Sequence, residues 1–177
     1  MPELILVTGG VKSGKSRLAA DCLTHLTPTP TLIATARRTD SEMSARIDRH
    51  IADRDERWQT IETPLHLADA LIRCSQPVLV DCLGVWLTNL LIETPEQMEE
   101  AILQFLQALD QRSAATVLVS NESSLGIIGA DALTRRYIDE LGLLNQSVAR
   151  KASHVVMSIV GLPQWLKGTD IRTKDIQ

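Results

Sequence analysis

Five short apolar runs are spread along the chain, at residues 4–8, 31–35, 77–81, 115–121 and 154–160. Each run is nearly continuous and does not alternate with polar residues. A strand of a parallel sheet is covered on both faces and has this pattern. The runs therefore predict buried parallel strands, and residues 163–167 predict a short additional strand at an edge.

The segments between these runs carry apolar residues at helical spacing. Helices are predicted over residues 16–26, 41–57, 84–92, 95–111 and 131–152, and one more after Pro64. Thr39 and Glu42 form a capping box before the second helix, and a proline suits the first turn of the helix after Pro64. Alternating strands and helices predict an α/β domain with a mainly parallel sheet. The length fits one domain over residues 1–177, with a polar tail at 168–177 that frays.

Composition narrows the classes of function. Hydrophobic residues make up 44% of the chain and charged residues 23%, as in an ordinary globular protein. The net charge of −4 argues against a broad nucleic-acid surface. Cys22, Cys74 and Cys82 form neither a metal pattern nor a disulfide framework, which favours the cytoplasm. We expect no membrane span and no secretory signal, because no apolar run is long enough and the start has no basic region.

A phosphate-binding loop follows the first apolar run. Its residues are Gly9, Gly10, Val11, Lys12, Ser13, Gly14, Lys15 and Ser16, which match G-x-x-x-x-G-K-[ST]. The glycines let backbone N–H groups surround phosphate oxygens, and the helix that follows adds its positive N-terminal end. Lys15 can reach the β- and γ-phosphates, and Ser16 can place a hydroxyl on Mg²⁺. The loop predicts that the protein handles a nucleoside triphosphate.

Two acidic residues come directly after predicted strands. Asp81 ends the run at 77–81, and in proteins with this loop such a residue holds Mg²⁺ opposite the loop serine. Asn121 and Glu122 end the run at 115–121, so they are expected at the same edge of the sheet. Glu122 either orients a nucleophilic hydroxyl or a water molecule, or caps the next segment, and the pattern does not separate these roles.

The predicted helix over 41–57 carries a basic stripe beside its apolar one. Arg46, His50 and Arg54 recur every four residues, so a histidine lies one turn from an arginine on either side. One interpretation is a solvated basic face with an incidental histidine. The other is that the two guanidiniums keep His50 neutral and clamp a polyphosphate, so that the imidazole attacks an α-phosphate. His25, His66 and His154 have no partners at useful spacing and are interpreted as structural.

The motifs occur in an order that resembles a known family. The residues that carry the resemblance are Thr8 to Gly10, Ser13 to Arg17, Ile33 to Thr35, Glu42, Met43, Arg46, Ile47, His50, Arg54, Trp58, Thr60 to Glu62, Asp81 to Leu83, Trp86 to Leu91, Ser120 to Glu122, Gly126, Ile127, Gly142, Asn145 and Gln146. They look like the bifunctional adenosylcobinamide kinase / adenosylcobinamide-phosphate guanylyltransferase of cobalamin biosynthesis, over nearly the whole chain. Many families share the loop, whereas its combination with the helix Glu-Met-x-x-Arg-Ile-x-x-His is much more specific.

The resemblance implies a RecA-like, three-layer P-loop NTPase domain that assembles as a homotrimer. It implies that ATP or GTP phosphorylates adenosylcobinamide, and that GMP from GTP then passes through a histidine to adenosylcobinamide phosphate. Mg²⁺ is the implied metal, held by Ser16 and Asp81, with Lys15 and His50 as catalytic residues. The implied nucleotide contacts outside the loop are Ile33, Ala34, Thr35, Ile51, Ala52, Asp53, Arg54, Glu62 and Asp81. A carboxylate such as Glu62 can accept hydrogen bonds from guanine N1–H and the N2 amine.

The sequence departs from the family pattern at two places, and two other functions remain open. Val11 and Lys12 stand where members of the family often carry Ala-Arg, and Gly129 follows Ile128 where many have proline. One alternative is a simple small-molecule kinase that forms no covalent nucleotide. The other is a nucleotide-dependent switch or assembly module without an acceptor substrate.

Overall fold

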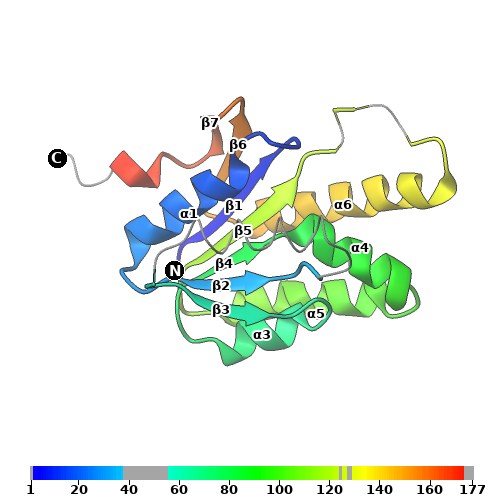
Figure 1. The fold of residues 1–177 in the computed structure, drawn as a ribbon, viewed down its shortest axis with the longest axis horizontal. Coiled ribbons are helices and arrows are strands. Elements are labelled where there is room, and N and C mark those ends of the chain that lie inside the picture. The colour runs from blue at the N-terminus through cyan, green and yellow to red at the C-terminus, as the bar shows by residue number, and fades with distance from the viewer. Residues whose placement is uncertain (1, 38–55, 124, 127–128, 174–177) are drawn as a thin grey trace.

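A single sheet organises the part of the chain that the computed structural model describes, residues 2–37, 56–123, 125–126 and 129–173. Its seven strands have the order β3-β2-β4-β5-β1-β6-β7. They are β1 (Leu4–Gly9), β2 (Thr31–Ala34), β3 (Gln59–Glu62), β4 (Val78–Asp81), β5 (Thr116–Asn121), β6 (His154–Ile159) and β7 (Leu162–Lys167). Neighbours run parallel except β6 and β7. The carboxyl ends of β2, β3 and β4 therefore lie at one edge (Figure 1).

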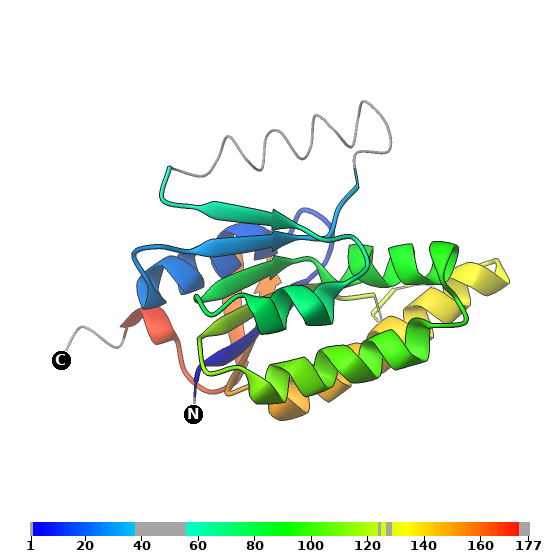
Figure 2. The ribbon, with the colours of Figure 1, turned by 90° about the horizontal axis from the view of Figure 1, so that it is seen from below.

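Helices cover both faces of the sheet. They are α1 (Lys15–Leu26), α3 (Leu67–Arg73), α4 (Leu83–Glu93), α5 (Met98–Gln111) and α6 (Ala132–Lys151), with a 3-10 helix η1 (Ile171–Thr173). Figure 2 shows α5 and α6 side by side on the same side of the sheet. Helix α1 packs on the opposite face, so the described residues form the three-layer α/β arrangement that the sequence predicts.

The strand alternation divides the core in two. On β1, Ile5 and Val7 belong to the cluster with α1, whereas Leu6 between them belongs to the cluster with α3, α4, α5 and α6. Trp86 and Phe105, with ring centroids 5.1 Å apart, are among the largest fully buried side chains of the second cluster. Successive strand residues point to opposite faces, so a nearly continuous apolar run fills both cores.

The predicted elements agree with the structure closely, apart from one strand. The apolar pattern does not predict β3, because only Ile61 of its four residues is even partly buried. The predicted helix over 41–57 lies outside the described residues except for its last two. Within the tail from residue 168, Ile171 is 2% exposed and packs in the α1 cluster, and the fraying of this tail stays a prediction.

The Arg112 side chain connects the end of α3 to the start of β5 through hydrogen bonds. Its guanidinium donates to the backbone oxygens of Leu71 (2.6 Å), Cys74 (2.6 Å) and Gln76 (2.7 Å), and to Thr116 Oγ1 (2.7 Å). Arg112 is 9% exposed. Burial lowers its pKa, and the guanidinium remains charged because its ordinary value lies so high. This one side chain thus satisfies carbonyls that the C-terminal turn of α3 leaves unpaired.

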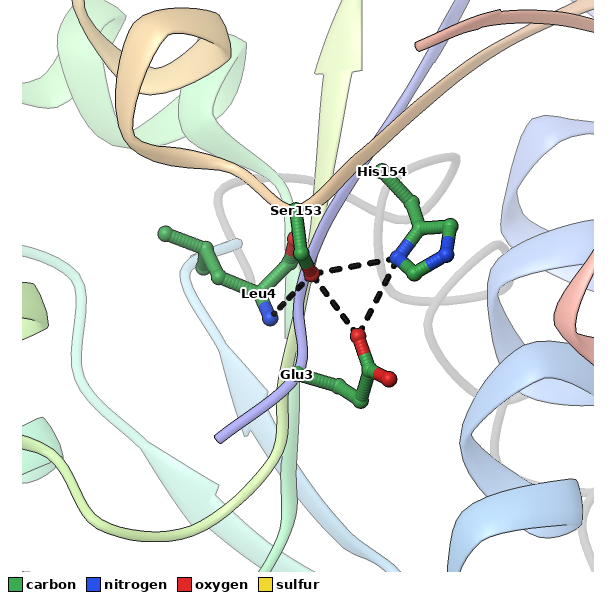
Figure 3. Close-up of polar contacts among 4 residues, drawn as sticks. All are labelled: Glu3, Leu4, Ser153 and His154. Carbon is green, nitrogen blue, oxygen red and sulfur yellow. Dashed lines mark hydrogen bonds and ion pairs between the residues drawn. The ribbon is translucent and has the colours of Figure 1, made fainter. Parts of the chain in front are cut away.

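A polar cluster joins the amino ends of β1 and β6, at the edge opposite the phosphate-binding loop (Figure 3). His154 Nδ1 lies 3.1 Å from Ser153 Oγ and 3.1 Å from a carboxylate oxygen of Glu3. The Ser153 hydroxyl is 2.8 Å from the same carboxylate and also accepts from the Leu4 N–H at 3.1 Å. The sequence spacing shows no partner for His154; the structure corrects this, because parallel pairing brings the start of β6 beside the start of β1.

Candidate nucleotide-binding site

The loop from Gly9 to Ser16 has a backbone that excludes larger residues at two positions. A Cβ on Gly9 would lie 2.5 Å from Ser13 Oγ and 2.6 Å from the Ser158 carbonyl oxygen. Gly14 has φ +92°, a left-handed conformation that favours glycine. The turn closes through a hydrogen bond from the Ser13 N–H to the Gly10 oxygen (3.3 Å). The loop is therefore tight enough to direct its N–H groups toward one anion.

Helix α1 begins at Lys15, and its amino end carries no side-chain cap. Its N-cap is Gly14, and its first turn contains no acidic residue. The first N–H groups of a helix have no intrahelical partner and attract anions. This end of α1 is therefore suited to phosphate, as the sequence motif predicts.

Strand β6 and the turn after it hydrogen-bond with the phosphate-binding loop. The Ser13 carbonyl oxygen accepts from the Ser158 hydroxyl at 2.6 Å and from the Gly161 N–H at 2.9 Å. Ser158 is 2% exposed, and the Gly161 Cα lies 3.3 Å from where a Cβ on Gly14 would be. Sequence reasoning missed both supports, because they are almost 150 residues away from the loop and match no motif.

Lys15 and Asp81 both lie close enough to Cys82 for their charges to act on its thiol. Strand β5 separates β1 from β4, and Asp81 pairs with Val119 while Gly9 pairs with Asn121. Burial, followed by the charge of Asp81, raises the pKa of Cys82 to about 11, and the charge of Lys15 opposes this shift. The Lys15 ammonium itself donates to the Gly10 oxygen at 3.0 Å. The predicted lysine and acid are thus brought to one place at the carboxyl edge.

Thr35 holds the end of β4. Its hydroxyl donates to the Cys82 oxygen (2.8 Å) and accepts from the Cys82 N–H (2.9 Å), and the residue is completely buried. Ile33 is likewise completely buried in the core. The contact of Ile33 and Thr35 with nucleotide stays a prediction. Because both side chains are buried, only backbone atoms of these residues are placed to make that contact.

Glu62 ends β3, the outermost strand on this side of the sheet. It is exposed and borders a cavity of about 670 Å³ that His66, Asp69 and Arg73 also line. Asn89 fixes the segment that follows, because its amide donates to the oxygens of Thr35 (2.9 Å) and Pro64 (3.0 Å). The amide of Asn89 thereby ties the ends of β2 and β3 together.

Glu122 follows β5 next to the loop. Its N–H donates to the Gly9 oxygen at 3.0 Å, and the preceding Asn121 accepts at its oxygen from the Asn145 amide at 3.0 Å. The Tyr137 hydroxyl and the Asn121 amide both face Gly84, because a Cβ there would lie 2.8 Å from the hydroxyl and 3.1 Å from Asn121 Nδ2. Burial raises the pKa of Tyr137, followed by the nearby Cys82, so the phenol stays protonated. Helix α6 therefore contributes two side chains to this edge.

The remaining predicted site residues fall outside the described ranges. These are His50, Ile51, Ala52, Asp53 and Arg54. Nothing in the described geometry tests their roles, and they stay predictions.

A G-x-x-x-x-G-K-[ST] loop after β1, with an acid at the end of β4 two strands away in a mainly parallel sheet, is the arrangement of the P-loop NTPase class of enzymes. A family model described as cobinamide kinase / cobinamide phosphate guanyltransferase matches residues 5–166, and the chain belongs to this family. The family predicted from the sequence motifs is thereby confirmed.

Curated relatives match over almost their whole length. The bifunctional adenosylcobalamin biosynthesis protein CobP of Pseudomonas aeruginosa is 41% identical over 167 residues, covering 92% of this chain and 96% of the relative. The bifunctional adenosylcobalamin biosynthesis protein CobU of Escherichia coli is 38% identical, covering 93% and 99%. A solved structure from Pyrococcus horikoshii, described only as a structural study of PH0250, shares the fold with a TM-score of 0.51 at 11% identity, covering 96% of this chain and 88% of that one.

Proposed function

We propose that this protein phosphorylates the hydroxyl of adenosylcobinamide with ATP or GTP, and then transfers GMP from GTP to the phosphate it has made. The observation that carries this proposal is the family match over residues 5–166, which spans the loop, Asp81 and His50. The tight loop supports the nucleotide-binding part of this proposal, because Gly9 and Gly14 allow its backbone N–H groups to converge on a phosphate.

The loop and Lys15 bind the triphosphate in this proposal, and Ser16 with Asp81 holds Mg²⁺. Among the described residues no three His, Cys, Asp or Glu side chains gather around one point. One carboxylate and one hydroxyl nevertheless fit Mg²⁺, which takes few protein ligands and completes its shell with phosphates and water. When bound, Mg²⁺ supplies positive charge beside the phosphates. Lys15 adds a second positive charge from the protein.

His50 is the proposed nucleophile for GMP. A ring nitrogen forms a bond to the α-phosphorus of GTP, the bond from that phosphorus to the α–β bridging oxygen breaks, and pyrophosphate leaves. Arg54 and the residues between it and His50 are proposed to contact the nucleotide, with Ile33, Ala34, Thr35 and Glu62. The exposed carboxylate of Glu62 beside a cavity supports its proposed role as acceptor for the guanine edge.

Assembly as a homotrimer in the cytoplasm completes the proposal. The antiparallel hairpin of β6 and β7 exposes Ile159, Val160, Leu162 and Leu166, each at least 47% exposed, which favours burial against another copy. Light scattering after size exclusion tests the trimer, and a mass equal to one chain would contradict it.

The three cysteines support the proposed location in the cytoplasm. All three are free, which suits a reducing compartment. None of the described helices is long and apolar enough to cross a membrane.

Intact-protein mass after incubation with GTP and Mg²⁺ tests the covalent route. We expect a gain of one GMP that is acid-labile, because the bond is a phosphoramidate, and no gain in His50→Ala. His25→Ala is the matched control and should gain the same mass as wild type. If GTP binds and no mass is gained, the covalent route is wrong and a simple kinase is the better account.

Phosphorylation of adenosylcobinamide is measured separately. Transfer of the γ-phosphoryl group from labelled ATP or GTP should occur in wild type and in His50→Ala, since the histidine serves only the second reaction. Hydrolysis without transfer to any acceptor would favour a nucleotide-dependent switch.

A further inference from the structure

Two side chains of helix α6, Asn145 and Tyr137, lie against Asn121 at the end of β5. Asn145 donates to the backbone oxygen of Asn121 at 3.0 Å, and the Tyr137 hydroxyl lies beside the Asn121 side chain at Gly84. The junction is closely packed, because a Cβ on Gly84 would lie 2.8 Å from the Tyr137 hydroxyl and 3.1 Å from Asn121 Nδ2. The backbone of Asn121 is therefore held by a hydrogen bond from α6, and its side chain packs near Tyr137 of the same helix.

Glu122, the next residue, is fixed to the nucleotide loop. Its N–H donates to the Gly9 oxygen at 3.0 Å, and Gly9 is the register partner of Asn121. The backbone of Glu122 is thus held on one side by β1, where the loop begins, and on the other by α6 through Asn121. Glu122 therefore lies at the carboxyl edge of the sheet, where open α/β sheets bind their ligands.

Unpaired polar groups lie beneath this junction. Ser120 is completely buried and Thr8 is 7% exposed, they pair in register, and neither hydroxyl has a hydrogen-bond partner among the described residues. The Asn145 side-chain oxygen is also buried without one. By strand alternation Thr8 and Ser120 share the face of Leu6 and Leu118, which belong to the core with α6. Buried polar groups cost free energy unless something binds them, so this set points to ordered water or a polar ligand.

We propose that Glu122 takes the proton of the acceptor hydroxyl in the kinase reaction, and that Tyr137 and Asn145 are positioning residues that hold it there. The proposal rests on the kinase activity proposed above. The hydroxyl O–H bond breaks and its proton moves to the Glu122 carboxylate. The oxygen forms a bond to the γ-phosphorus, the bond from that phosphorus to the β–γ bridging oxygen breaks, and the nucleoside diphosphate leaves.

The second reaction has no need of this base. Its acceptor is a phosphate monoester, whose oxygens are already ionised near neutral pH. Glu122 should therefore matter for phosphorylation and not for GMP transfer. This difference separates a base from a residue that only maintains the fold, since a damaged fold would impair both reactions.

The test measures both reactions on the same variants. Glu122→Gln should lower the kinase kcat about 100- to 10,000-fold, the range of a general base, with the KM for ATP within about twofold. Tyr137→Phe and Asn145→Ala should lower it about tenfold, because they displace the base without removing it. GMP transfer to adenosylcobinamide phosphate, supplied directly, should stay within about twofold in all three.

Matched controls lie on α6 itself. Asp139→Asn makes the same carboxylate-to-amide change at an exposed position, and Ser147→Ala removes a hydroxyl that bonds only within the helix. Both should behave as wild type. Tyr137→Phe removes a single oxygen atom. The test can therefore rest on this variant if Asn145→Ala unfolds at a lower temperature than wild type. A Glu122→Gln kinase kcat within about threefold of wild type, or equal losses in both reactions, would overturn the inference. If wild type itself phosphorylates nothing, the proposed function has failed instead.

Discussion

Removing the Arg112 guanidinium should destabilise the protein more than almost any other single change of a charged residue. The substitution Arg112→Met keeps the length of the side chain and deletes its hydrogen bonds. The bonds to the Leu71 oxygen and to Thr116 Oγ1 are buried, whereas those to the Cys74 and Gln76 oxygens are partly exposed. Water can replace the latter two, so we count only the buried pair. At about 1.5 kcal/mol for each hydrogen bond to a charged group, the loss is about 3 kcal/mol.

Equilibrium unfolding in urea, followed by far-ultraviolet circular dichroism, measures this loss directly. In a chain of this size 3 kcal/mol corresponds to a fall in Tm of about 6–12 °C. Arg150→Met is the matched control, because Arg150 is exposed and its guanidinium, within the described part of the chain, bonds only to Ser147; it should stay within about 0.5 kcal/mol of wild type. A loss below about 1 kcal/mol for Arg112→Met, with an unchanged m-value, would refute the argument that Arg112 satisfies buried carbonyls.

Three further predictions concern the loop, the thiols and a helix cap. Lys15→Ala should lower the kinase kcat/KM at least about 100-fold, while the circular dichroism spectrum stays that of wild type, since Lys15 is needed for phosphate charge and not for the core. Ellman's reagent at about pH 8 should label no cysteine but Cys74 in the folded protein, because burial raises the pKa of Cys22 to about 12 and that of Cys82 to about 11; rapid labelling of three thiols would contradict this. Hydrogen bonds within the first turn of α6 lower the pKa of Asp131, so its contribution to stability is present above the ordinary value of 3.8 and is lost as pH falls through the lowered value. The urea midpoint of Asp131→Ala should therefore lie below that of wild type near neutral pH, and the gap should close in acid; a gap that is constant with pH would show that the carboxylate charge is not involved.

The loop is the clearest case in which local sequence suffices. A strand, two obligatory glycines, a lysine and a helix start are consecutive in the chain, so their chemistry can be predicted without knowing what lies beside them. The same holds for Asp81, because the end of a buried strand in a parallel sheet must lie at the binding edge. The strand register places Gly9 and Asp81 at the carboxyl edge of the sheet, and the roles of Lys15 and Asp81 there stay predictions.

Other contacts at the site follow from no local pattern. Ser158 and Gly161 support the loop because β6 happens to pair with β1, and nothing in their own segment marks them. The same pairing gives His154 its partners at the opposite edge of the sheet. Strand β3 was missed for a related reason, because an exposed edge strand buries too little apolar surface to produce a run.

By itself the sequence determined the class of fold, the position of the phosphate-binding loop and the family, since these depend on residues that are close together in the chain or on motifs in a fixed order. Only the tertiary structure decided the order of the strands, and with it which side chains meet. The sequence places Asn121, Glu122 and Asn145 in motifs. The hydrogen bond from Asn145 of α6 to the end of β5 forms only when the sheet and the helix have packed together. Pairing of distant segments is set by burial of the whole core, a property that no short pattern contains.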